Sequence, residues 1–222
     1  ELAEAINAGA ALNSMTVDST GDKHNPKTYT LTAGEDKIDL GNKNLGPADI
    51  NLISVWLATD AGAAVTSINC LANKFGEEDL ATLLTAIEGT SVRSLCGLTE
   101  GQTIADFSGQ NLRPIDTKIM AAEYGFQGFI ADVKKVILSK NFLFGSKLKY
   151  GETIHDIDAD QTGWSSLCDS FKGSSIEELI LCDVGMGVNG VASLADAIKF
   201  MAALTSMKCL NNSFGEGVHT LS

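Results

Sequence analysis

The sequence contains no apolar run of the length that crosses a bilayer. Its longest helical apolar stretch, residues 50–64, is interrupted by Asn51, Ser54, Thr59 and Asp60, whereas a membrane-spanning helix needs about 20 mainly apolar residues. The first residues, Glu-Leu-Ala-Glu-Ala-Ile, have neither the basic flank nor the apolar centre of a signal peptide. We therefore expect no transmembrane segment.

Basic residues are scarce. The chain of 222 residues has 16 Lys and Arg against 28 Asp and Glu, which gives a formal net charge of −12. No basic patch alternates with aromatic residues, so nucleic acid is not an expected partner. An acidic balance keeps a protein soluble and can attract a basic partner.

Paired cysteines are also missing. The number of cysteines is odd, at five, and no two of them have the Cys-x-x-Cys spacing. This pattern predicts reduced thiols and an intracellular location.

Sets of residues that could catalyse a reaction are equally absent. The three histidines, His24, His155 and His219, lie far apart in the chain, and none has a cysteine neighbour that would complete a metal site. No phosphate-binding loop or nucleophile elbow is present. We expect no enzyme activity and no cofactor.

What the sequence does contain is an internal repeat. Residues 65–77 and 204–216 share Thr, Ser, Cys, Leu, Asn, Phe, Gly and Glu at the same offsets, and weaker copies begin at Leu12, Val92, Val133 and Ile176. Self-similarity at such spacings is typical of solenoid proteins. The repeat predicts strands that start near residues 12, 65, 92, 133, 176 and 204.

Each repeat reads as a short strand followed by a helix. Apolar residues alternate in the strands, so that Val136 and Leu138, for example, face inward. The helices follow Gly or Pro and carry an acid in the first turn, as at Asp49, Asp79 and Asp116. One strand and one helix cannot bury their apolar faces alone, but stacked copies can.

The repeat resembles a known family. The pattern Val-x-x-Ile-x-Cys-x-x-Asn-x-Phe-Gly at residues 65–76 resembles the leucine-rich repeat of the ribonuclease-inhibitor type. The resemblance implies a single α/β solenoid over residues 1–222, with a curved parallel sheet inside and helices outside. It also implies that Asn73, Asn141 and Asn212 hydrogen-bond the backbone of adjacent turns.

The long repeats share a second motif, Leu-x-x-Gly-x-x-x-x-Asp followed by an apolar residue. It occurs at residues 31–40, 98–107 and 148–157. A glycine between two alternating segments is typical of a β-hairpin. We therefore expect Gly34, Gly101 and Gly151 to lie in the turns of hairpins outside the main sheet.

Outward-facing strand residues on the concave side are the candidate partner-binding set, with plain solvent exposure as the alternative for each. This set consists of Ser14, Ser67, Asn69, Ser94, Lys135, Glu178, Ser206 and Lys208.

Two other motifs have competing interpretations. Residues 185–190 read Gly-x-Gly-x-x-Gly, the pattern of a dinucleotide-binding loop, but they align with the ordinary turn of the repeat. Asp156, Asp158 and Asp160 alternate as in a calcium loop, yet Gln161 and Leu167 stand where that loop needs Gly and Glu. We interpret both motifs as repeat structure.

The function expected from these observations is protein binding or scaffolding within a larger assembly. A regulatory or targeting region of a larger enzyme is the alternative, and a nucleotide-dependent enzyme is a more remote one. Residues 1–9 resemble the helix of a preceding repeat and residues 215–222 the start of a further helix. Because solenoids need polar caps, we expect the chain to be part of a longer protein with two uncapped ends.

Overall fold

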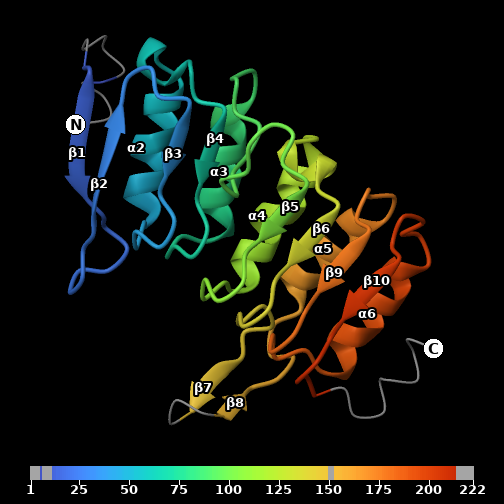
Figure 1. Cartoon of the computed structure of the whole chain (residues 1–222). Helices are drawn as coiled ribbons and strands as arrows, with labels where there is room; N and C mark the ends of the chain where they lie inside the picture. The colour runs from blue at the N-terminus through green and yellow to red at the C-terminus, as the bar shows by residue number, and fades with distance from the viewer. Residues whose placement is uncertain (1–5, 7–11, 150–152, 214–222) are drawn as a thin grey trace. The chain divides into compact units, whose positions relative to one another are not determined.

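The protein has a mixed α/β structure (Figure 1). The structure is a computed structural model, which describes Ile6, residues 12–149 and residues 153–213. The chain divides into two compact units, unit 1 (Glu1–Thr99) and unit 2 (Glu100–Ser222). Each unit contains parallel strands followed by helices.

Unit 1 combines an antiparallel strand pair with two strand–helix repeats. β1 and β2 pair antiparallel, and β3 and β4 pair parallel. A parallel bridge between Ser67 and Ser94 extends the β3–β4 pairing by one position. The elements are β1 (Ser14–Asp18), β2 (Thr28–Thr32), β3 (Lys37–Asp39), α2 (Pro47–Leu57), the 3₁₀ helix η1 (Asp60–Gly62), β4 (Ser67–Asn69) and α3 (Glu77–Ile87).

Unit 2 contains a four-stranded parallel sheet in the order β5–β6–β9–β10, with helices α4, α5 and α6 behind it in Figure 1. β7 and β8 form a separate antiparallel pair. The elements are β5 (Ile104–Asp106), α4 (Pro114–Gly125), η2 (Phe129–Asp132), β6 (Lys135–Ile137), β7 (Lys147–Lys149), β8 (Thr153–His155), α5 (Thr162–Phe171), β9 (Glu178–Ile180), α6 (Val188–Ile198) and β10 (Ser206–Lys208).

The spacing between strand and helix is regular. In four repeats the helix begins ten residues after the strand begins: Lys37 and Pro47, Ser67 and Glu77, Ile104 and Pro114, and Glu178 and Val188. The β6 repeat is longer because β7 and β8 are inserted before α5.

A carboxylate in the first turn fixes where three of these helices begin. Asp49 accepts a hydrogen bond from the Gly46 N–H at 2.8 Å, and Asp79 accepts one from the Gly76 N–H at 2.9 Å. Asp116 does the same at α4. These bonds satisfy backbone donors that have no partner inside the helix, so the expected acidic helix starts are confirmed.

Buried asparagines join consecutive repeats, as predicted. The Asn73 side-chain oxygen accepts bonds from the N–H groups of Lys43 and Leu45, both at 3.0 Å, in the preceding repeat. Its amide nitrogen donates to the carbonyls of Leu40 and Cys70 at 2.8 and 2.9 Å. One side chain therefore satisfies backbone groups of two successive turns.

The same arrangement recurs in unit 2. Asn141 is buried, accepts from the Leu112 N–H and donates to the carbonyl of Phe107. Asn212 is half-buried, accepts from the Val184 N–H at 3.1 Å and donates to the Leu181 carbonyl. The shared repeat position thus corresponds to a shared set of backbone bonds.

The strands do not all lie where the repeat predicted them. The strand near Leu12 was expected in the parallel sheet, but β1 pairs antiparallel with β2 instead. The other parallel strands form separate sheets, β3–β4 in unit 1 and β5–β6–β9–β10 in unit 2.

The predicted hairpins at Gly34 and Gly101 are also wrong. Both glycines have positive φ, 79° and 74°, but each precedes a strand of a parallel sheet, β3 or β5. The motif's aspartate ends that strand, since Asp39 accepts a bond from the Gly41 N–H, two residues on. β7 and β8 do pair antiparallel as expected, while Gly151 lies outside the described residues.

The β1–β2 pair covers the first repeat with a polar outer surface. Met15, Tyr29 and Leu31 are buried, whereas Thr16 and Thr30 on the opposite face are exposed. Except for Ile6, the predicted helices at residues 1–9 and 215–222 lie outside the described residues.

A buried carboxylate holds this pair in place. Asp49 accepts bonds from the N–H and the hydroxyl of Thr20, at 2.8 and 2.7 Å, and from the Tyr29 hydroxyl at 3.1 Å. It also accepts the Gly46 bond at the start of α2. Asp49 therefore links β1–β2 to the first helix.

An Asn73→Ala substitution tests the asparagine bonds. It leaves the Leu45 N–H and the Leu40 carbonyl without their partner, and should lower the free energy of unfolding by about 1–3 kcal/mol. Asn51→Ala, on the exposed face of α2, is the matched control. Urea denaturation should show little change for the control, and equal losses for the two variants would contradict the assignment.

A Tyr29→Phe substitution tests the Asp49 network through pH. Burial, followed by the charge of Asp49 and the hydrogen bond to it, raises the pKa of Tyr29 well above its usual value near 10. Above about pH 10 the unfolded chain therefore loses this proton while the folded chain keeps it, and stability falls with rising pH by up to about 1.4 kcal/mol per unit. The free energy of unfolding of Tyr29→Phe should fall less steeply between pH 9 and 11 than that of the unmodified protein. Parallel curves for the two proteins would refute this role of Tyr29.

Candidate interaction surface

The face of the unit 2 sheet that is turned away from the helices presents two rows of side chains. The strand register places Ile104, Lys135, Glu178 and Ser206 in the first row, and Asp106, Ile137, Ile180 and Lys208 in the second. The residues between the rows point the other way, since Ala105, Val136 and Leu179 are buried. We call these eight residues the sheet face.

Ion pairs cross the sheet face. Lys135 lies 2.8 Å from one oxygen of Glu178, and Lys208 lies 3.8 Å from the other. The hydrogen bond from Lys135 lowers the pKa of Glu178. Because these groups keep partial contact with solvent, the pairs orient the side chains more than they stabilise the fold.

Asp106 lies on the outer strand β5. Its carboxylate accepts bonds from the N–H and the hydroxyl of Ser108, at 2.9 and 2.6 Å. The hydroxyl bond, together with the N–H bond, lowers the pKa of Asp106. The group is therefore negatively charged at neutral pH and held in one orientation.

Apolar side chains lie among these charges. Ile104 is 54% exposed, and Ile137 and Ile180, which are register partners, are half-buried. Ile137 and Ile180 therefore form a small apolar centre between the charged side chains.

The structure brings together half of the predicted partner-binding residues. Lys135, Glu178, Ser206 and Lys208 all belong to the sheet face. Ile104 and Asp106 were missed because residues 98–107 were interpreted as a hairpin. The available signal was the sequence Ile104-Ala105-Asp106, which in a strand places the isoleucine and the acid on the same face.

The other four predicted residues lie in unit 1, and two of them are not solvent-facing as expected. Ser67 and Ser94 are buried, and the Ser94 hydroxyl accepts bonds from the N–H groups of Cys96 and Leu98. Asn69 donates to Asp39 at 3.0 Å, and Ser14 is exposed on β1 rather than on a parallel strand.

The glycine loop at residues 185–190 already holds an anion from the protein itself. Asp158 accepts bonds from the N–H groups of Gly187 and Asn189, at 2.7 and 2.9 Å, at the start of α6. A nucleotide phosphate would need the same N–H groups. α6 has Gly190 where three other helices have their capping aspartate, so Asp158 supplies the missing carboxylate.

The other two candidate calcium ligands do not join Asp158. Asp160 accepts bonds from the N–H and hydroxyl of Thr162 at the start of α5, and Asp156 is exposed with a φ of 57°. Among the residues that the structure describes, no group of three His, Cys, Asp or Glu side chains is arranged to hold a metal ion.

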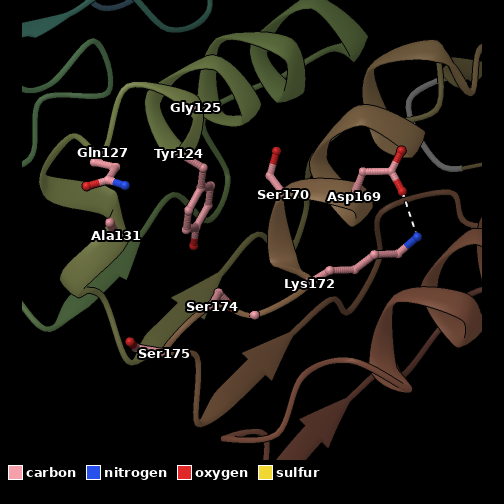
Figure 2. A pocket seen from close by; sticks show the side chains of 10 residues that line it. Tyr124, Gly125, Gln127, Ala131, Asp169, Ser170, Lys172, Ser174 and Ser175 are labelled. Carbon is pink, nitrogen blue, oxygen red and sulfur yellow. Dashed lines mark hydrogen bonds and ion pairs between the residues drawn. The ribbon is translucent and has the colours of Figure 1, made fainter.

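A cleft of about 400 Å³ lies in unit 2 between the C-terminal ends of α4 and α5 (Figure 2). Tyr124, Gln127 and Ser174 line it, and Lys172 lies at its edge, where it pairs with Asp169 at 2.8 Å and also with Asp196. The hydrogen bond to Asp169 raises the pKa of Lys172. A protonated lysine does not act as a nucleophile.

Burial makes two of the thiols, Cys168 and Cys209, less reactive. None of the five cysteines forms a disulfide, and Cys70, Cys96 and Cys168 are buried. Burial raises the pKa of the Cys168 thiol and raises the pKa of the Cys209 thiol to about 11. A reactive thiol requires the opposite shift.

No protein-family model matches the sequence, and no curated protein matches it. None of the helices in the described ranges has the length and apolar character needed to cross a membrane.

The assignment of Asp158 predicts a stability effect in unit 2. Asp158→Ala removes the acceptor for two N–H groups of α6 and should lower the free energy of unfolding by about 1–2 kcal/mol. The control is Asp132→Ala, at the exposed end of η2. Chemical denaturation should separate the two variants, and an unchanged midpoint for Asp158→Ala would contradict the capping role.

Proposed function

We propose that this chain is part of a leucine-rich-repeat protein, with repeats of the ribonuclease-inhibitor type, that binds other proteins and does not turn over a substrate. The sheet face is the proposed binding surface. In this proposal the strand–helix repeats form a solenoid, and β7–β8 is an insertion in one of its long repeats.

The regular backbone supports the repeat assignment. In four repeats the helix begins ten residues after the strand begins, and three asparagines make the same bonds to the preceding turn. Sequence repetition and repeated geometry agree, which is expected when each repeat packs only against its neighbours.

The main support for protein binding is the sheet face. Four parallel strands fix the spacing and orientation of its side chains, and three isoleucines on it contact water. The backbone of the sheet would therefore have the same conformation before and after a partner binds. Such preorganisation reduces the entropy cost of binding.

The competing functions have less support. The nucleotide hypothesis needs helix N–H groups that Asp158 already occupies. A regulatory or targeting region of a larger enzyme remains compatible with the proposal, because such a region would bind its target through the same kind of surface.

Capture from the native source tests the proposal. An Ile137→Glu substitution places a charge at the centre of the sheet face and should reduce recovery of bound chains at least tenfold. Val188→Glu changes an apolar residue that is 48% exposed on α6 and should retain them. Far-ultraviolet circular dichroism checks that both variants are folded, and equal capture by both would overturn the proposed surface.

A further inference from the structure

The second row of the sheet face has opposite charges at its two ends. Asp106 stands on β5 and Lys208 on β10, and the register places Ile137 and Ile180 between them. The carboxylate of Asp106 is held in place by Ser108. The side chain of Lys208 is 59% exposed, and its ion pair with Glu178 is long, at 3.8 Å. The row therefore runs acid, apolar, apolar, base.

The size of this row matches a short extended peptide. Three strand intervals separate its ends, about 14 Å at roughly 4.8 Å each. An extended chain covers nearly that distance in about four residues, at roughly 3.4 Å per residue, and its alternate side chains point to the same side. Residues i, i+2 and i+4 of such a segment would therefore lie over Asp106, the isoleucine pair and Lys208.

The area of the face argues against a second copy of this chain. Four strands of three residues present about 200 Å² at roughly 4.8 Å by 3.3 Å per residue. A stable dimer buries about 800 Å² on each partner, so the face alone is too small for stable self-association. It is large enough for five residues in extended conformation.

We infer that the sheet face recognises an extended protein segment with one basic and one acidic residue four positions apart and an apolar residue midway between them. The basic side chain pairs with Asp106, the acidic one with Lys208, and the apolar one packs on Ile137 and Ile180. Either chain direction satisfies this arrangement. The inference rests on the proposed function and adds the chemistry of the partner.

Two labelled peptides provide the test, measured by nuclear magnetic resonance titration of the full chain. The mixed-charge probe is acetyl-Gly-Lys-Thr-Val-Thr-Glu-Gly-amide, and the second probe has Glu in place of its Lys. Exposed ion pairs are each worth roughly a factor of two to five in affinity. The unmodified protein should therefore bind the mixed-charge probe roughly fivefold more tightly, with shifts at Ile137 and Ile180.

Single charge reversals sharpen the test. Asp106→Lys makes both ends of the row basic and should reverse the preference, so that the doubly acidic probe binds better. Glu88→Lys, an exposed acid of unit 1, makes the same change in net charge and should leave the preference intact.

The outcomes separate this inference from the proposed function. Binding that Ile137→Glu abolishes but that shows no charge preference would overturn the inference and leave the surface assignment standing. Binding that survives in Ile137→Glu lies elsewhere and overturns both. A dimer in light scattering that Lys208→Glu dissociates would make a second copy the occupant and would also overturn the inference.

Discussion

The buried asparagine amide is the interaction on which the repeated structure depends. Asn73 and Asn141 each satisfy donors and acceptors of the turn before their own. These turns have backbone groups that no regular helix or sheet can pair, and an unpaired buried group costs as much as a lost hydrogen bond. The asparagines therefore satisfy these backbone groups at the point where one repeat follows the next.

Local chemistry explains what the sequence could predict. The asparagine position, the inward strand residues and the acidic helix starts recur in the sequence, and each depends on neighbours within one repeat or the next. β3 and β5 were missed because a glycine before three extended residues looks the same in a hairpin and in a turn that leads into a parallel strand. The bond that Asp39 or Asp106 makes to the N–H two residues on distinguishes them, and this bond is visible only in the structure.

Interactions over long sequence separation account for the remaining differences. Asp158 reaches α6 across 29 residues, so a run of acids that suggested calcium proved to be a cap. Ser94 looked like a surface strand residue, but its hydroxyl serves the turn that follows it. The carboxylates of Asp49, Asp116 and Asp158 thus accept hydrogen bonds from backbone N–H groups. The charged groups that a partner could contact are mainly other ones, such as those of the sheet face.

Amide hydrogen exchange at Leu45 and Leu112 tests the asparagine account most directly. Both N–H groups lie outside regular helices and strands and donate to the side chains of Asn73 and Asn141. The account predicts that both exchange as slowly as the hydrogen-bonded amides of the parallel strands. In Asn73→Ala the amides of Leu45 and Lys43 should exchange faster, because both donate to Asn73, whereas the Leu112 amide should be unchanged. Exchange of both amides at the rate of an exposed loop in the unmodified protein would contradict it.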